Sequence, residues 1–125
     1  MTAERLQALR DLAIMARDAE LAKVADVTRR ISALRLDIAR LEDARIARET
    51  DPALDTARLA GADLPWAAWC EGQLRARQNA LAALHVAHET ALQAARQAFG
   101  RAEALAGLSE RAAAERRKAR MRRAF

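Results

Sequence analysis

The first 50 residues of the chain place their apolar side chains at the spacing of one helix face. Residues 3–50 contain neither Gly nor Pro, and their apolar positions follow one another mostly at steps of three or four, the period of an amphipathic α-helix. Between Val24 and Leu41 the steps alternate between three and four, as in a coiled coil. We predict one long helix over residues 3–50, with a shift of register at Leu21. Its expected inner positions are Leu6, Leu9, Ala13, Ala16, Val24, Val27, Ile31, Leu34, Ile38 and Leu41.

The helical pattern is interrupted over residues 51–64, which we predict to form the turn of a hairpin. Asp51 can cap a new helix, and Pro52 suits the first position of that helix because its missing N–H is not needed there. A short helical piece is expected to follow and to end near Gly61.

A second long helix is predicted over about residues 65–122, because Asp63 and Pro65 repeat the order of a cap followed by a proline. Its inner positions are rich in Ala, and small side chains allow two helices to approach closely. They are Trp66, Leu74, Leu81, Leu84, Ala91, Ala95, Ala98, Ala102, Leu105 and Ala112. The expected fold is all-α: residues 1–125 form a single domain, a long two-helix antiparallel coiled-coil hairpin with a short helical turn segment.

The composition supports this class, because aromatic residues make up 3% of the chain and Tyr is missing from it. A rounded core would lack the bulky side chains that usually fill one. The net charge of +5 is concentrated at the C-terminal end. There, seven basic residues face one acidic residue, Glu115. The seven are Arg111, Arg116, Arg117, Lys118, Arg120, Arg122 and Arg123.

This basic segment is a candidate binding surface with two possible partners. It could bind the phosphates of a nucleic acid, although no aromatic residue interleaves with it to stack on bases. It could also attract an acidic protein surface, or it could equally be a frayed, solvated tail.

Trp66 and Trp69 are candidate partner-binding residues at the turn. They lie three residues apart near the start of the second helix and therefore share a face. They either pack with Leu54, Leu59 or Leu64 as a small core, or anchor a partner, since tryptophan contributes disproportionately to binding at interfaces.

No catalytic, cofactor or metal site is predicted. The only serines are Ser32 and Ser109, and the carboxylates are spread along the helix faces. His85 and His88 are three apart, but no third ligand accompanies them, so we assign them to the surface or to the edge of the helix interface. We therefore do not expect an enzyme.

Several features favour a cytoplasmic protein. Cys70 is the only cysteine, so no disulfide can form within the chain. The N-terminal residues carry charges every few positions, unlike a signal peptide. No uncharged stretch approaches the roughly 18 residues of a membrane span, so we expect no integral membrane segment.

The chain resembles the FliJ family of flagellar export proteins and the related YscO-type stalk proteins of type III secretion. The resemblance is carried by residues 5–12, followed by Ala-rich heptads, and by residues 104–111, which lead to Glu115, Arg116 and Arg117. It implies a cytoplasmic helical hairpin without a cofactor. It also implies chaperone-like or stalk-like binding to an export ATPase and to the export gate. The residues matched at the ATPase end would be Leu105, Leu108, Glu110 and Arg111.

Three functions are open from the sequence. The first is a component of an export apparatus that couples the export ATPase to the export gate. The second is a nucleic-acid-binding coiled coil that uses residues 111–125. The third is a generic dimeric coiled-coil adaptor, since a two-helix interface leaves a second helix face available for self-association. We expect a monomer. The role of Gly100 and Gly107, which lie opposite the inner positions of their helix, is open.

Overall fold

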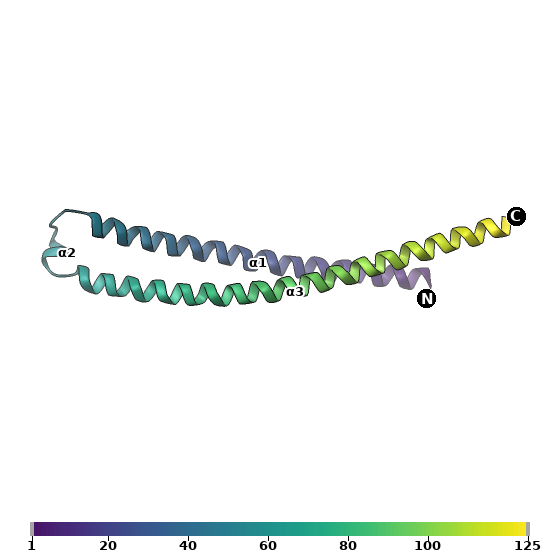
Figure 1. Cartoon of the computed structure of the whole chain (residues 1–125), viewed down its shortest axis with the longest axis horizontal. Coiled ribbons are helices and arrows are strands. Elements are labelled where there is room, and N and C mark those ends of the chain that lie inside the picture. The colour runs from purple at the N-terminus through teal and green to yellow at the C-terminus, as the bar shows by residue number, and fades with distance from the viewer. Residues whose placement is uncertain (1, 125) are drawn as a thin grey trace. The chain divides into compact units, whose positions relative to one another are not determined.

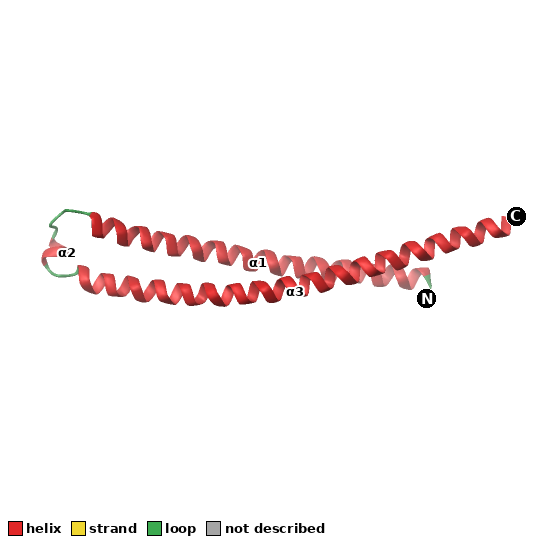
Figure 2. Ribbon diagram, viewed as in Figure 1, coloured by secondary structure: helices red, strands yellow, loops and turns green. Residues whose placement is uncertain are grey.

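The computed structural model describes residues 2–124 and is helical throughout except around one turn. Helix α1 spans Ala3–Thr50, α2 spans Thr56–Leu59 and α3 spans Asp63–Ala124 (Figures 1 and 2). None of the described residues forms a β-strand. Helices α1 and α3 pack against each other as a helical hairpin, so the prediction of an all-α hairpin is confirmed.

The hairpin groups into two compact units. The first, here called the terminal unit, comprises Met1–Ala25 and Glu89–Phe125, and the second, called the turn unit, comprises Asp26–His88. Each unit therefore combines one part of α1 with one part of α3, and each is described by itself.

In the turn unit, the least exposed residues of α1 follow the predicted line. Ile31 is buried, and Val27, Leu34, Ile38 and Leu41 are half-buried. The alternation of three and four residues continues toward the turn with two half-buried arginines, Arg45 and Arg48.

The facing part of α3 also follows the predicted line, and the line includes three further positions, Cys70, Arg77 and His88. Leu74 is buried, and Trp66, Leu81 and Leu84 are half-buried. Cys70 is the most deeply buried residue of the unit, with no exposed surface. A free thiol in this place behaves as a small apolar side chain, and the sequence analysis had not assigned it to the interface.

In the terminal unit, α3 packs through small side chains. Ala95, Ala98 and Ala102 are only 5–7% exposed, and Ala91, Leu105 and Ala112 are half-buried, as the sequence predicted. Because these side chains are short, the backbones of the two helices can approach closely, and little space remains for large apolar groups from α1.

The predicted inner positions of α1 in this unit are partly wrong. Leu9 is 40% exposed, Ala16 is exposed, and Leu21 does not mark a shift of register. Instead, the alternation of three and four residues runs unbroken from Val24 back to Leu6. The half-buried positions on this line are Glu20, Arg17, Ala13 and Arg10, and Ile14 beside it is also half-buried.

Long polar side chains can occupy such positions because their hydrocarbon stems cover apolar surface while the charged ends reach water. The guanidinium of Arg17 lies 5.7 Å from the centre of the Phe99 ring, in cation–π range. Arg10 and Arg17 therefore occupy inner positions where the sequence analysis expected their neighbours Leu9 and Ala16.

The turn differs from its prediction at the first cap. No helix starts at Pro52. The Asp51 carboxylate accepts a hydrogen bond from the N–H of Ala53 at 3.0 Å, which forms a local turn in place of a helix cap. Helix α2 starts four residues later and is capped by Asp55, whose side chain accepts from the N–H of Arg58.

The end of α2 agrees with the position expected for Gly61. This residue has φ 75°, in the left-handed region that favours glycine. Its N–H donates to the carbonyl of Arg58 at 3.1 Å, and the N–H of Ala62 donates to the carbonyl of Ala57 at 2.9 Å. These two bonds form a Schellman motif, which ends α2.

We expect the Ala-rich interface to be sensitive to side-chain volume. Replacing Ala98 by Leu should lower the stability of the hairpin by about 1–3 kcal/mol, because a packed site has no room for three further carbons. Thermal unfolding followed by circular dichroism measures the effect. The matched control is Ala104→Leu, at an exposed position of the same helix. Equal melting temperatures for the two variants would show that Ala98 is not closely packed.

Candidate partner-binding surfaces

The turn is held together by Arg48, which lies in the last turn of α1. Its guanidinium donates two hydrogen bonds to the Asp55 carboxylate, from Nη1 at 2.6 Å and from Nη2 at 2.9 Å. Its Nε donates to Asp63 Oδ1 at 2.8 Å. Charge-assisted bonds of this bidentate kind have a defined geometry. Arg48 therefore connects the ends of α1 and α3 with the cap of α2.

Arg58 completes this network from α2. Its Nε donates to Asp63 Oδ2 at 3.0 Å. Its Nη1 donates to the carbonyls of Asp51 at 2.6 Å and Ala53 at 2.8 Å, and its Nη2 donates to the carbonyl of Arg48 at 3.1 Å. Backbone carbonyls at a helix end and in a turn lack partners within the helix. Arg58 supplies donors to them and orders the backbone of residues 48–53.

The network shifts the acid–base behaviour of its members. Hydrogen bonds from Arg48 lower the pKa of Asp55 far below its ordinary value, and hydrogen bonds from Arg48 and Arg58 lower the pKa of Asp63. The pKa of Arg48 is raised by the hydrogen bonds to Asp55 and Asp63. The charged forms of all these groups are thus favoured in the folded turn.

Large apolar side chains project from this ordered turn into solvent. Leu54 is 76% exposed, Leu59 75%, Leu64 82% and Trp69 54%. We call these four residues the turn surface. The expectation that the leucines form a small core with the tryptophans is wrong. Within the described residues, no other element covers these side chains. The groups next to them belong to the Arg48 and Arg58 network and are polar.

The two tryptophans have different surroundings. Trp66 is half-buried and lines two hollows of the turn unit, one of about 380 Å³ that also involves Arg45 and Leu64, and one of about 310 Å³ that also involves Ala44. Trp69 lies mostly in solvent. Of the two predicted partner-binding residues, Trp69 is therefore the accessible one, whereas Trp66 belongs mainly to the interface between α1 and α3.

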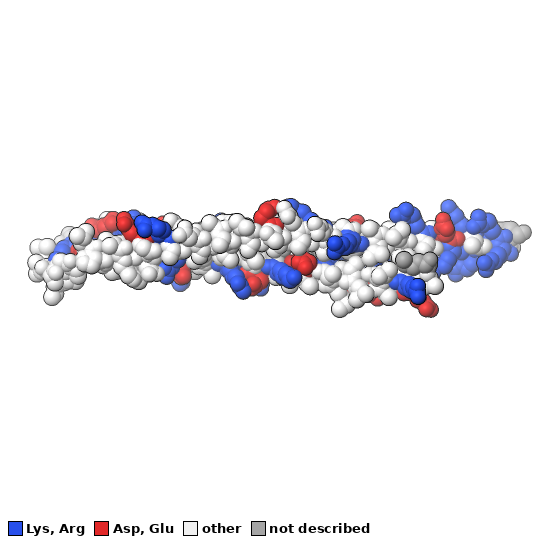
Figure 3. Space-filling model, turned by 90° about the horizontal axis from the view of Figure 1, so that it is seen from below, with Lys and Arg blue, Asp and Glu red and all other residues white. Residues whose placement is uncertain are grey.

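The second candidate surface is the C-terminal part of α3. The seven basic residues predicted from the sequence are all exposed, and Figure 3 shows Lys and Arg side chains gathered there. We call them the basic surface: Arg111, Arg116, Arg117, Lys118, Arg120, Arg122 and Arg123. Among the residues that the structure describes, none of the seven forms an ion pair with a carboxylate.

Within residues 2–124, no helix lies beside the last turns of α3. The terminal unit contains residues 89–124 of α3 but only residues 3–25 of α1, so the last turns of α3 run past the start of α1 (Figure 1). An isolated helix of this length is marginally stable in water. Like charges four residues apart, as at Arg116 and Arg120, reduce its stability further.

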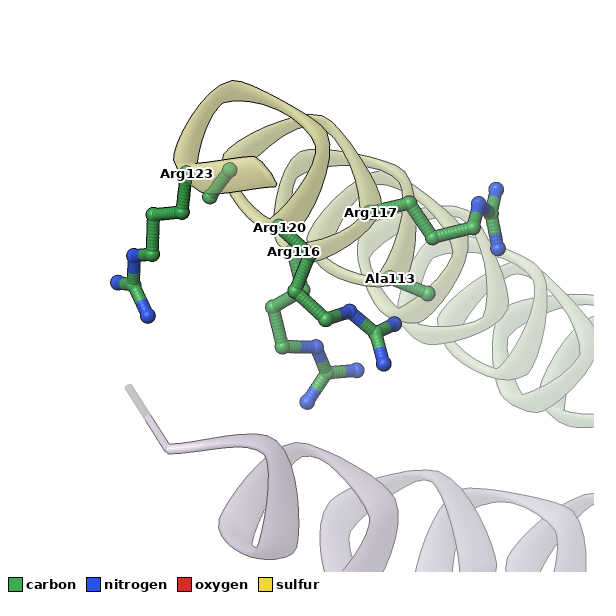
Figure 4. A pocket seen from close by; sticks show the side chains of 6 residues that line it. Ala113, Arg116, Arg117, Arg120 and Arg123 are labelled. Atoms are coloured by element: carbon green, nitrogen blue, oxygen red, sulfur yellow. The ribbon is translucent and has the colours of Figure 1, made fainter. Parts of the chain in front are cut away.

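Three arginines of the basic surface share one side of the helix. Arg116, Arg120 and Arg123 are spaced by four and three residues. Figure 4 shows Arg116 and Arg120 extending on the side where α1 begins, while Arg117 points elsewhere. A hollow of about 500 Å³ between these side chains is lined by residues of α3 alone. It is therefore a surface groove between side chains, suited to an extended anionic partner.

The remaining sequence candidates do not assemble into a site. His85 is exposed, with its Nε2 3.4 Å from a guanidinium nitrogen of Arg35, and His88 is half-buried. Within residues 2–124, no group of three or more His, Cys, Asp or Glu side chains could hold a metal ion. Gly100 is exposed, and the Arg111 side chain lies beside Gly107.

Sequence reasoning missed both the turn network and the exposure of the leucines. The charges at positions 48, 55, 58 and 63 form the network only when the chain reverses direction, which residue spacing alone does not show. The leucines carried a weak signal, because Leu54, Leu59 and Leu64 do not follow the three–four period that marks an inner helix face.

Comparisons with protein-family models, with curated proteins and with solved structures find no match to this chain. Separately, no helix among the described residues is both long enough and apolar enough to cross a membrane.

We expect the turn to lose its order in acid. Asp55 and Asp63 have folded-state pKa values below that of an unfolded aspartate, about 3.9. The unfolded turn therefore binds more protons at low pH. The stability that these groups contribute is fully present above about pH 5 and is lost as the pH falls through their folded-state pKa values. Tryptophan fluorescence between pH 7 and pH 1 should report the change, because Trp66 lies beside Arg48 and Asp63.

Two variants test the cause. Arg48→Gln removes the main hydrogen-bond donor to both carboxylates and should move the fluorescence transition to higher pH. Arg45→Gln changes a neighbouring arginine outside the network and should leave the transition in place. A transition unaffected by Arg48→Gln would contradict this account.

Proposed function

We propose that this chain is a non-enzymatic stalk or chaperone-like component of a flagellar or type III protein-export apparatus, and that it couples the export ATPase to the export gate. The proposal begins from the family resemblance of residues 5–12 and 104–111. It is supported by the helical hairpin and by two accessible surfaces of different chemistry, one in each unit. In this proposal the chain acts in the cytoplasm and requires no cofactor.

We further propose that the two long helices form an antiparallel coiled coil. Low exposure recurs at alternating steps of three and four along α1, from Leu6 to Arg48, and along α3, from Cys70 to Ala112. This is the heptad pattern of coiled-coil core positions. Such a pair buries one face of each helix and leaves the other faces available to partners.

The basic surface is the single observation that carries the proposal. Its seven cations are exposed, have no carboxylate partners among the described residues, and lie near the end of α3, whose last turns run past the start of α1. An acidic groove on the ATPase would bring carboxylates to these guanidinium groups and would relieve the repulsion between Arg116 and Arg120. Binding would thereby stabilise the last turns of α3.

The turn surface supports a second partner, which in this proposal is the export gate. Leu54, Leu59, Leu64 and Trp69 expose apolar area that is costly to leave in water. The ion-pair network holds the backbone beneath them in one arrangement, so little conformational entropy is lost when a partner binds.

Nucleic acid is the competing partner of the basic surface. The described part of this surface contains no aromatic side chain that could stack on a base. Binding through phosphates alone would be non-specific in sequence and would weaken steeply with salt. We therefore favour an acidic surface of the export ATPase as the partner, and the experiments below distinguish the two.

We expect charge reversal on the basic surface to weaken binding to the export ATPase by about tenfold or more. The variant is Arg116→Glu, Arg120→Glu and Arg123→Glu combined, and the measurement is titration calorimetry with the purified ATPase at fixed salt. The matched control reverses three other exposed arginines of α3, at Arg75, Arg96 and Arg101. An equal loss of affinity in both triple variants would show that the net charge of the chain, and not the basic surface, determines binding.

The same proteins identify the partner. If the unaltered chain binds single- or double-stranded nucleic acid more tightly than the ATPase at physiological salt, the export proposal loses its main support. The slope of the logarithm of the binding constant against the logarithm of the salt concentration should then decrease by about one for each arginine that contacted a phosphate.

At the turn, we expect Leu64→Ala combined with Trp69→Ala to weaken binding to the gate protein and to leave the helical content unchanged, because both side chains lie mainly in solvent. Circular dichroism and a pull-down with the cytoplasmic part of the gate provide the two measurements. Leu36→Ala serves as the control, since Leu36 is an exposed apolar residue of the turn unit away from the turn. Unchanged gate binding in the double variant would remove the turn surface from the mechanism.

A further inference from the structure

In the terminal unit, α1 has an apolar line on its solvent side as well as on its inner side. Toward α3 it places the buried Leu6 and the half-buried Ile14 together with half-buried charged residues. On the opposite side, Leu12 is 60% exposed and Met15 is 66% exposed. A helix with one neighbour normally buries its most apolar face, so this orientation requires an explanation.

Part of the explanation lies in α3. Its side of the interface consists of closely packed alanines, with Ala98 only 5% exposed. Leucine and methionine side chains directed there would overfill the space between the helices. The narrow stems of Arg10 and Arg17 fit beside alanine and leave their charged ends in water. Leu12 and Met15 are therefore displaced to the outer face.

The displaced side chains form a second regular line along α1. Its positions follow steps of four, three, four and three and are all exposed: Ala8, Leu12, Met15, Ala19 and Ala22. We call this line the N-terminal stripe. Alternation of three and four is the spacing of helix-pairing positions, and the stripe extends for two heptads.

The charges along the two borders of the stripe differ. One border carries only acidic side chains at steps of seven, Glu4, Asp11 and Asp18. The other border, also at steps of seven, carries Leu9, Ala16 and Lys23, with no acid. Asp18 and Lys23 have strongly exposed side chains, 62% and 67%, and within the chain Asp18 pairs with Arg17 at 3.2 Å and Lys23 with Glu20 at 3.3 Å. Exposed ion pairs of this kind contribute little stability, so both charges can pair with another copy instead. Border charges of this kind determine which helices pair and in which direction.

We propose that the N-terminal stripe pairs in parallel with the same stripe of a second copy of this chain. In a parallel pair, each residue of the acidic border faces the residue five positions later on the other border of the partner helix. Each Asp18 therefore lies opposite Lys23 of the other copy. An antiparallel pair would place the acidic border against itself, because equivalent borders then lie on the same side. Charge complementarity therefore selects a second copy in parallel orientation.

Pairing in this direction places the two basic surfaces at the same end of the dimer. Each basic surface belongs to the same unit as the stripe, and their mutual repulsion opposes dimer formation at low salt. We therefore expect self-association to strengthen as salt rises from low to physiological values, because salt screens charges that lie farther apart than the pairing residues. A dimer would also engage a polyanionic or acidic partner with two basic surfaces at once.

The sequence analysis favoured a monomer and kept a dimeric coiled-coil adaptor as an alternative. The exposed line of apolar residues on α1 favours self-association. Two heptads bury less than the roughly 1,200 Å² of a standard interface, so the pairing is weak and depends on concentration.

Sedimentation equilibrium of the full chain tests the proposal. The mean mass should rise from about that of one chain near ~5 µM toward that of two chains near ~200 µM, as for a dissociation constant in the micromolar range. Leu12→Glu combined with Met15→Glu should keep the mass of one chain throughout. Leu36→Glu, the same change at an isolated exposed leucine, should behave as the unaltered chain. One-chain mass for the unaltered protein at ~200 µM, or equal effects of the two variants, overturns the proposal.

Cysteine cross-linking tests the direction. Ala22→Cys should form a disulfide-linked dimer under mild oxidation, because equivalent residues on the pairing line face each other in a parallel pair. Cys70 is fully buried and can remain in place. Ala8→Cys should form the corresponding dimer with itself. Cross-links that appear only when the Ala8→Cys and Ala22→Cys proteins are mixed would show antiparallel pairing and overturn the proposed direction.

Discussion

Each long helix of this protein has one neighbour, and this constraint governs the rest of the structure. A helix pair can bury only one face of each member, so few side chains are removed from water. In the part that the structure describes, the buried hydrophobic residues number seven, and three of them are the alanines Ala95, Ala98 and Ala102. The close approach that alanine allows yields dispersion contacts between backbones that large side chains would prevent.

The same constraint explains why polar interactions organise the turn. In the part of the chain that the structure describes, no further element covers residues 51–62, so burial does not order them. Arg48 and Arg58 order them instead, by linking two carboxylates and three backbone carbonyls with charge-assisted hydrogen bonds. The apolar side chains of Leu54, Leu59 and Leu64 are left outside as a consequence. A rigid polar base that supports exposed apolar groups is a suitable arrangement for binding a partner.

Exposed surfaces therefore carry the functional proposals for this chain. The turn surface is apolar, the basic surface is cationic, and the N-terminal stripe is apolar with one acidic border. Three chemistries on separate parts of a hairpin suit a protein that connects partners. The export-apparatus proposal uses the first two surfaces, whereas the stripe concerns how copies of the chain associate with one another.

The sequence by itself determined the two long helices, the position of the turn and the Ala-rich inner line of α3. Glycine and proline are missing from residues 3–50, so nothing in this stretch interrupts a helix. Apolar residues at steps of three and four lie on one face of that helix, which is the face it buries. The concentration of basic residues after position 110 is equally local, so it was visible without a structure. Only the tertiary structure decided which residues of α1 meet α3 between Leu6 and Val24. Leu9 and Ala16 have helical spacing, and so do Arg10 and Arg17. The narrow space beside the alanines of α3 accommodates the arginine stems. The tertiary structure also decided the pairing of Arg48 and Arg58 with Asp55 and Asp63, since those contacts exist only once the chain has turned back on itself.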